Sequence, residues 1–280
     1  MDVLVSTEWL AGELGASDLR LLDATIFLPA SGRDARAEYE AEHIPGAAFM
    51  DLDSIADPSN PLPHSFPTPA LFASRIRSLG VGDADRVVVY DNSPLHSAAR
   101  GWWMLRSFGA KRVALLDGGL AKWKAEGRPI ARGVAGVRAG HFTPAEVEAA
   151  VADKAFVASL VGSSEVQIVD ARPGPRFRGE EAEPRPGVAP GHIPGSKSLP
   201  QSELFEADGT WKRGEALGAA FEAAGVDLSK PMVTTCGSGV TAAVLLLGAH
   251  LLGKEDVRLY DGSWSEWGAD PATPKATGAP

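Results

Sequence analysis

The chain repeats itself once. Three landmarks occur in the same order in both halves: Leu-Leu-Asp and Ile-Val-Asp ending at Asp23 and Asp170, His-Ile-Pro-Gly starting at His43 and His192, and Asp-Gly with a tryptophan behind it starting at Asp117 and Asp261. The spacing from first to last landmark is nearly equal in the two halves. Solenoid repeats have periods of only about 20–50 residues. The sequence therefore predicts a duplicated domain.

Each half alternates short apolar runs with helical patterns. The runs cover residues 87–90, 113–116, 232–235 and 257–260, and the helical patterns cover residues 97–108 and 240–252. Strands that are apolar on both faces are typical of a parallel sheet covered by helices. We expect an α/β fold of two tandem domains, each a parallel β-sheet flanked by helices.

The expected boundaries follow the repeat. We predict an N-terminal domain over residues 1–130, a linker with a connecting helix over 131–152, and a C-terminal domain over 153–280. Residues 131–140 are rich in Gly, Ala and Arg without apolar periodicity, as linkers are. Thr143 precedes Pro144 and is the predicted N-cap of the helix that follows.

Charge and hydropathy argue against nucleic acid and membranes as partners. The net charge of -9 provides no basic surface for nucleic acid. The longest apolar stretch, residues 240–252, is shorter than the roughly 20 residues that span a bilayer, so no membrane association is expected. The first residues lack the basic region of a signal peptide, and we expect a cytoplasmic protein.

Cys236 is the only cysteine and the strongest candidate for chemistry. It follows a β-prone run and opens the loop Cys-Gly-Ser-Gly-Val-Thr before a helical pattern, where backbone N–H groups favour a thiolate. The alternative is a buried, inert cysteine. Gly237 and Gly239 favour the functional interpretation, because glycine permits close approach of a ligand. With no second cysteine, a covalent intermediate must be discharged by an outside molecule.

The duplication provides an internal comparison for this loop. Alignment of the two halves places Asp91 where the second half has Cys236. The first half therefore has no nucleophile at this position. We expect the C-terminal domain to be catalytic and the N-terminal domain to support it.

Together, these motifs resemble the rhodanese superfamily, and within it the two-domain 3-mercaptopyruvate sulfurtransferases. The resemblance implies that the Cys236 thiolate takes the sulfur of 3-mercaptopyruvate as a persulfide and releases pyruvate, a reaction of cysteine catabolism. The sulfur then passes to a small thiol, a thioredoxin-like protein or cyanide. Neither a metal nor a cofactor is implied. The loop amides, contributed by Gly237, Gly239, Val240 and Thr241, would hold the sulfur anion.

The resemblance also assigns a pair of arginines. Arg176 and Arg185 match the residues that grip the substrate carboxylate in that family, and a guanidinium suits bidentate carboxylate binding. The alternative is that these arginines neutralise acidic neighbours on a solvated loop, namely Glu180, Glu181 and Glu183. From the residues alone, that alternative is favoured for Arg178 and Arg185.

A proton relay is the third feature that the resemblance implies. Ser238 would join an Asp and a His of the other domain to polarise the substrate, and the matching residues are Asp34 and His43. The alternative is that these two residues only stabilise a turn and the domain interface.

Three further residues have mainly structural interpretations. His192 is expected to stabilise a turn through nearby backbone. Thr241 closes the loop and is expected to cap the next helix, a role as favoured as a catalytic one. Trp264 could line the substrate pocket beside Cys236, although an aromatic residue at such a position is more often part of a core.

Three rival functions differ in their fit. Phosphatase relatives use a Cys-x5-Arg loop, and the sixth position after Cys236 is Ala242, so this activity is excluded. Thiosulfate sulfurtransferases carry Arg and Lys after the cysteine, where this chain has neutral Gly237 and Ser238. Thiosulfate as donor, and a sulfur carrier or thiol sensor without turnover, stay open as alternatives.

Overall fold

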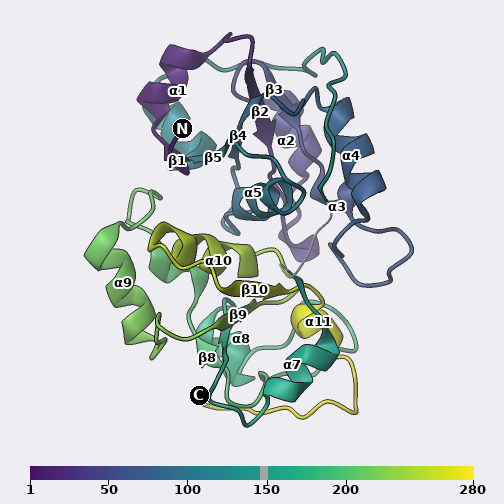
Figure 1. Ribbon diagram of the computed structural model, residues 1–280, viewed down its shortest axis with the longest axis vertical. Coiled ribbons are helices and arrows are strands. Elements are labelled where there is room, and N and C mark those ends of the chain that lie inside the picture. Colours follow the sequence, from purple (N-terminus) through teal and green to yellow (C-terminus); the bar gives the residue numbers. More distant parts are fainter. Residues whose placement is uncertain (146–150) are drawn as a thin grey trace. The chain divides into compact units, whose positions relative to one another are not determined.

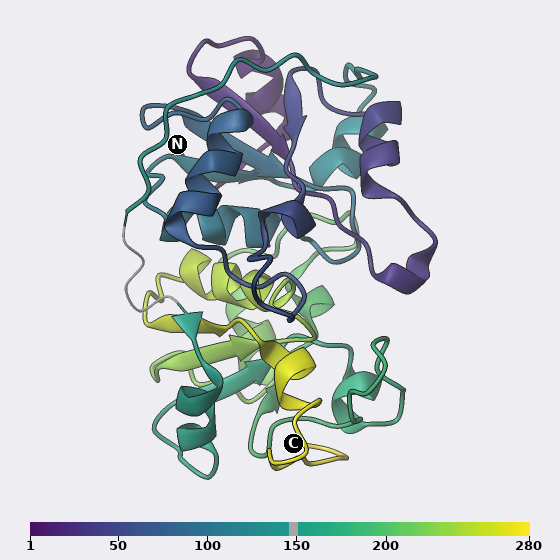
Figure 2. The same ribbon diagram turned by 90° about the vertical axis from the view of Figure 1, so that its right-hand side faces the viewer.

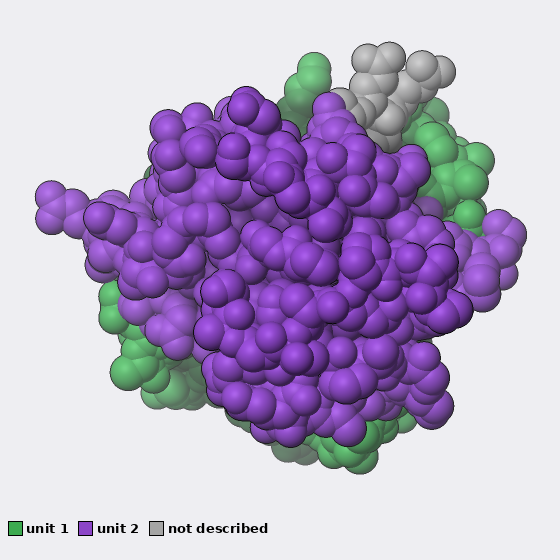
Figure 3. Space-filling view, turned by 90° about the horizontal axis from the view of Figure 1, so that it is seen from below, with its two compact units in different colours: residues 1–57, 67–147, 206–211 green, residues 58–66, 148–205, 212–280 purple. Residues whose placement is uncertain are grey.

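Contacts divide the chain into two compact units. The computed structural model describes residues 1–145 and 151–280. Unit 1 comprises Met1–Asp57, Pro67–Val147 and Glu206–Trp211, and unit 2 comprises Pro58–Phe66, Glu148–Phe205 and Lys212–Pro280, coloured green and purple in Figure 3. Each unit thus includes a short segment from the opposite half of the sequence.

Unit 1 is built on a five-stranded sheet with the order β1-β5-β4-β2-β3, and all strand pairs are parallel (Figure 1). The strands are β1 (Leu4–Val5), β2 (Leu19–Asp23), β3 (Ala47–Phe49), β4 (Arg86–Tyr90) and β5 (Val113–Leu116). The helices are α1 (Thr7–Glu13), the 3-10 turn η1 (Pro29–Ser31), α2 (Ala35–Ala41), α3 (Leu52–Ile55), α4 (Pro69–Ser78), α5 (Ala98–Ser107) and α6 (Gly119–Ala125).

Unit 2 repeats this topology with the order β6-β10-β9-β7-β8, again entirely parallel. The strands are β6 (Val151–Ala152), β7 (Gln167–Asp170), β8 (Lys197–Ser198), β9 (Met232–Thr235) and β10 (Val257–Tyr260). The helices are α7 (Lys154–Leu160), α8 (Gly174–Arg178), the 3-10 turn η2 (Gln201–Leu204), α9 (Gly214–Ala223), α10 (Ala242–Leu251) and α11 (Ser263–Trp267). Figure 2 shows both sheets from a second direction, with helices on their faces.

The predicted α/β fold is confirmed, because each apolar run is a strand and each helical pattern a helix. The patterns at 97–108 and 240–252 contain α5 and α10, and the runs are β4, β5, β9 and β10. In α10 the residues from Ala242 to Ala249 are all buried, as expected for a helix that is apolar all round. No helix in the described part of the chain is long and apolar enough to cross a membrane.

One local prediction is wrong and one is not tested. Thr143 donates from its N–H and its hydroxyl to the Asp83 carboxylate. The helix expected after it lies largely in residues 146–150, outside the described residues, so the predicted cap stays a prediction. Thr241 precedes α10 but makes no capping hydrogen bond, because its own backbone is already helical with φ -75° and ψ -16°.

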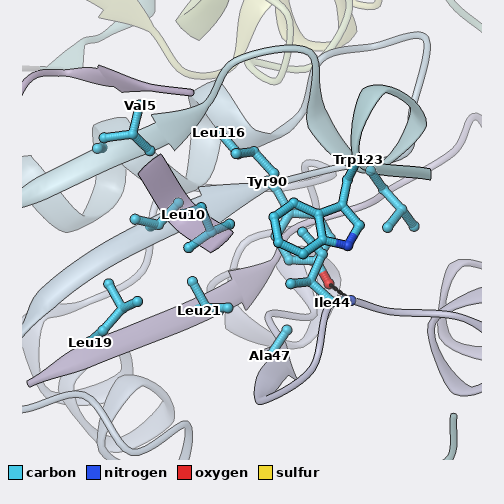
Figure 4. Packing of buried hydrophobic residues seen from close by; sticks show 12 residues of the cluster. Val5, Leu10, Leu19, Leu21, Ile44, Ala47, Tyr90, Leu116 and Trp123 are labelled. Carbon is cyan, nitrogen blue, oxygen red and sulfur yellow. Dashed lines mark hydrogen bonds between the residues drawn. The ribbon is translucent and has the colours of Figure 1, made fainter. Parts of the chain in front are cut away.

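The repeated motifs build equivalent cores. The isoleucines of His-Ile-Pro-Gly, Ile44 and Ile193, and the tryptophans after Asp-Gly, Trp123 and Trp267, are all fully buried. Figure 4 shows Trp123 and Ile44 close to Tyr90, whose hydroxyl accepts a 3.2 Å hydrogen bond from the Ile44 amide. The landmarks that reveal the duplication are therefore largely packing residues.

Candidate active site

Cys236 lies at the carboxyl end of β9, on the loop of residues 236–241 that leads into α10. Steric constraints explain why two positions of this loop are glycine. Gly239 has φ +79°, and a Cβ on Gly237 would lie 3.2 Å from Nη2 of Arg176. The Cys236 residue is only 2% exposed, so its burial alone does not distinguish a nucleophile from an inert thiol. The groups around the loop make that distinction.

The loop backbone is held by the start of α11. The Cys236 carbonyl accepts from the Trp264 amide at 2.9 Å, and the Gly237 carbonyl accepts from the Ser265 amide and hydroxyl at 2.8 and 2.6 Å. Fully buried Ser263 accepts at its Oγ from the amides of Cys236 and Gly239, at 3.2 and 3.1 Å. These bonds fix the orientation of the peptide groups that follow the cysteine.

The loop amides differ in their partners within the protein. The Gly239 amide donates to Ser263 Oγ, and its expected contact with the substrate sulfur stays a prediction. The amides of Gly237, Val240 and Thr241 donate to no acceptor among the described residues. Those three N–H groups are the ones that an anion on the loop can use.

Unit 1 lacks the two hydroxyls that hold this loop. Gly119 and Ala121 stand at the positions of Ser263 and Ser265, and only the Leu120 amide repeats the contact, with the Asp91 carbonyl at 3.0 Å. Ser263 and Gly119 both have left-handed backbones, with φ +49° and +57°. A Cβ on Gly119 would lie 2.6 Å from the Asp91 carbonyl oxygen. The serines thus distinguish the cysteine-bearing unit.

Asp91 occupies the cysteine position of unit 1 as a buried carboxylate. It accepts from the Ser93 and Ala98 amides at 3.1 and 2.7 Å, and burial raises its pKa from 3.8 to about 6. The first half has no nucleophile there, as the alignment predicts.

This raised pKa predicts a pH effect on stability. Between pH 3.8 and about 6, the folded protein keeps the Asp91 proton that the unfolded chain loses, so the folded state is progressively disfavoured as pH rises. The free energy of unfolding of wild type, minus that of Asp91→Asn, should fall by about 3 kcal/mol from pH 3.5 to pH 7. Urea titrations of both proteins at several pH values measure this difference in the free energy of unfolding. A difference that does not change with pH would refute the assignment.

Ser238 is paired with a histidine that no sequence motif singles out. Its Oγ lies 2.9 Å from Nδ1 of His64, on the segment Pro58–Phe66 that belongs to unit 2. Ser238 is 6% exposed, and His64 is half-buried with a left-handed backbone at φ +57°. A non-glycine residue in this conformation is uncommon and often marks a functional site.

The two residues expected beside Ser238 make other contacts. His43 Nδ1 lies 2.8 Å from the Tyr39 carbonyl, and the imidazole stacks on the Tyr39 ring. Asp34 caps α2 by accepting from the Ala37 amide at 3.0 Å. Both contacts fit the structural alternative, and the relay through His43 and Asp34 stays a prediction, while the histidine observed beside Ser238 is His64.

The second His-Ile-Pro-Gly motif behaves like the first. His192 Nδ1 lies 2.9 Å from the Phe177 carbonyl, and its ring stacks on Phe177 with centroids 3.8 Å apart. The expected structural role of His192 agrees with this contact. Trp264, the other residue with two interpretations, is 1% exposed and part of the unit 2 core.

Arg176 lies in a buried network of charges beside the loop. Arg172 is paired with Asp170 at 2.7 Å and with Glu183 at 2.7 Å, and Arg176 Nη2 bonds to the other oxygen of Glu183. The Glu183 side chain is only 4% exposed. Buried carboxylates of this kind orient a guanidinium as well as neutralise it.

One donor of Arg176 stands out. Its Nε is buried and has no hydrogen-bond partner among the described residues, although a buried unpaired donor is costly. Arg178, two residues on, shows the contrasting arrangement, because its side chain is 38% exposed and pairs with Glu180 at 2.7 Å. Arg185 is half-buried, and its substrate role stays a prediction. The Cys236 loop thus lies beside the guanidinium of Arg176, which Glu183 holds in a fixed orientation.

Comparisons with known proteins agree with this geometry. The model of the Rhodanese-like domain matches residues 6–126 and 153–270. The 3-mercaptopyruvate sulfurtransferase of Mus musculus is 46% identical over 276 residues, covering 94% of this chain and 91% of the relative. That of Escherichia coli K12 is 42% identical over 266 residues, covering 95% and 94%. The thiosulfate sulfurtransferase of Gallus gallus is 42% identical over 278 residues, covering 94% and 92%.

A solved structure matches the fold. The crystal structure of SseA from Escherichia coli, described as a 3-mercaptopyruvate sulfotransferase with the rhodanese fold, has a TM-score of 0.86 and 39% sequence identity. The match covers 95% of this chain and all of that chain.

Proposed function

We propose that this chain, which belongs to the rhodanese-like family and has two copies of its domain, is a sulfurtransferase that moves the sulfur of 3-mercaptopyruvate to a thiol or to cyanide. The observation that carries the proposal is the position of Arg176 against Gly237, next to Cys236. A donor with a carboxylate near its sulfur can bind both groups at once. The names of the similar enzymes support the same donor.

The first half-reaction forms a persulfide. The Cys236 thiolate attacks the sulfur of 3-mercaptopyruvate, an S–S bond forms, and the C–S bond breaks. The electron pair of the broken bond leaves on carbon as the enolate of pyruvate, which takes up one proton. The result is a persulfide on Cys236 and free pyruvate, in a covalent mechanism of two half-reactions.

Ser238 and His64 are suited to supply the proton. The 2.9 Å pair can pass a proton through the serine hydroxyl toward the enolate, and histidine is a suitable acid near neutral pH. The amides of Gly237, Val240 and Thr241 can stabilise the sulfur anion without rearrangement. Arg176, with Arg185, is our assignment for the donor carboxylate.

The second half-reaction passes the outer sulfur to an acceptor. We include a small thiol, a thioredoxin-like protein and cyanide, since the chain has no other cysteine to take it. The catalytic domain is then the C-terminal one, residues 153–280, completed by the His64 segment. We assign the reaction to the cytoplasm, a compartment that suits a lone free thiol.

Donor competition tests this function. With cyanide as acceptor, we expect faster turnover of 3-mercaptopyruvate than of thiosulfate at equal concentration, with pyruvate and thiocyanate in equal amounts, because the loop lacks the cationic residues that suit a small dianion. Faster turnover of thiosulfate would make that the donor. One persulfide per protein without further turnover would identify a sulfur carrier.

A further inference from the structure

The aspartates of the two Asp-Gly motifs make matching contacts. Asp261 Oδ2 accepts a hydrogen bond from the Phe66 amide at 2.7 Å. Asp117 Oδ1 accepts one from the Trp211 amide at 2.9 Å. In each unit the aspartate thus binds the backbone of the segment that comes from the other half of the sequence, Pro58–Phe66 in unit 2 and Glu206–Trp211 in unit 1.

The two bound segments differ in what they carry. The segment held by Asp261 contains His64, whose Nδ1 lies 2.9 Å from Ser238. The segment held by Asp117 has the sequence Glu-Ala-Asp-Gly-Thr-Trp and contains neither a histidine nor a cationic residue. The same anchor therefore holds a segment with a histidine in unit 2 only.

His64 needs such an anchor. It lies two residues before Phe66 and has φ +57°, a conformation that a non-glycine residue keeps only when neighbouring contacts fix it. A carboxylate that accepts from a backbone amide forms a strong, short hydrogen bond. Asp261 also begins the turn that carries Ser263. Residues 261–263 therefore contact both the Cys236 loop and the segment that carries His64.

We propose that Asp261 is a positioning residue for sulfur transfer: it accepts the Phe66 amide and so fixes the backbone that presents His64 to Ser238. The inference rests on the function proposed above. Asp261 acts on the reaction through His64 and contacts no reacting atom in this assignment. Asp117 makes the equivalent bond without this role.

A double-mutant cycle tests the assignment in the full chain, with pyruvate release from 3-mercaptopyruvate as the readout. Asp261→Ala should slow release about tenfold, a normal coupling within one hydrogen-bond network. Asp261→Asn should restore most of the rate, because its amide oxygen still accepts from Phe66. Asp117→Ala, which removes the matching bond in unit 1, should change the rate less than about twofold.

The decisive comparison uses the His64→Ala background. In that background, Asp261→Ala should cause no further slowing of pyruvate release. A separate measurement checks the loop: in the single variant Asp261→Ala, the rate of Cys236 alkylation by iodoacetamide should stay at the wild-type value. Asp261→Ser replaces the alanine variant if circular dichroism shows that the latter does not fold.

Four results would overturn the assignment: equal slowing by Asp117→Ala, full slowing by Asp261→Ala without His64, no rescue by asparagine, or altered alkylation of Cys236. The first three are measured as pyruvate release and therefore require an active wild-type protein, whereas alkylation of Cys236 is measured independently of turnover. A wild-type protein that releases none would instead refute the proposed function.

Discussion

Cys236→Ser is expected to release no measurable pyruvate from 3-mercaptopyruvate and to form no thiocyanate. A serine hydroxyl fits the space of the thiol but is a far weaker nucleophile, and it cannot form a persulfide. Loss of the nucleophile in covalent catalysis lowers the rate on the order of 10⁴–10⁶-fold. Pyruvate formation, followed with lactate dehydrogenase, measures the effect.

Mass spectrometry checks the intermediate separately. Wild-type protein exposed to 3-mercaptopyruvate alone should gain one sulfur atom on Cys236, and the serine variant should gain none. Circular dichroism of the two proteins checks that the serine variant is folded. Turnover that survives the substitution would show that the chemistry does not occur at this thiol.

Arg176→Ala is expected to raise the donor KM by about two orders of magnitude while the KM for cyanide changes little. The estimate follows from the loss of charge-assisted hydrogen bonds to a carboxylate, each of roughly 1.5–3 kcal/mol. Glu183 keeps its bond to Arg172 in this variant, so no carboxylate is left buried and unpaired. Steady-state kinetics with both substrates varied separate the two KM values.

Arg178→Ala is the matched control. Arg178 lies on the same helix, α8, two residues away, and its exposed ion pair with Glu180 contributes little. Its removal should leave the donor KM within about twofold of wild type. Equal donor KM values for the two alanine variants would remove Arg176 from the carboxylate site.

The local sequence was sufficient to predict the strands β4, β5, β9 and β10, the buried helix α10 and the Cys236 loop. These features depend on apolar runs and on residues within a few positions of one another. The resemblance of the Arg-Phe-Arg-Gly segment added Arg176. The acidic residues near Arg176 differ in their environment, which the sequence does not show. Glu180 pairs with Arg178 at the surface, whereas Glu183 is buried between two arginines.

His64 could not be predicted in this way. It lies in no periodic segment and no repeated motif, and its place beside Ser238 depends on contacts between residues far apart in the chain, such as Phe66 with Asp261. His43 stood out because its motif is repeated, and His43 and His192 make the same imidazole contact with a backbone carbonyl. A repeated motif identifies what both domains need in order to fold, whereas Cys236 occurs in only one of them.

The glycine at position 119 limits what a single substitution could add to the first domain. Restoring a cysteine at Asp91 would still leave its loop without the hydroxyl that Ser263 supplies, and any side chain on Gly119 would collide with the Asp91 carbonyl oxygen. Evolution of a second reactive centre would therefore require coordinated backbone changes rather than one reversion.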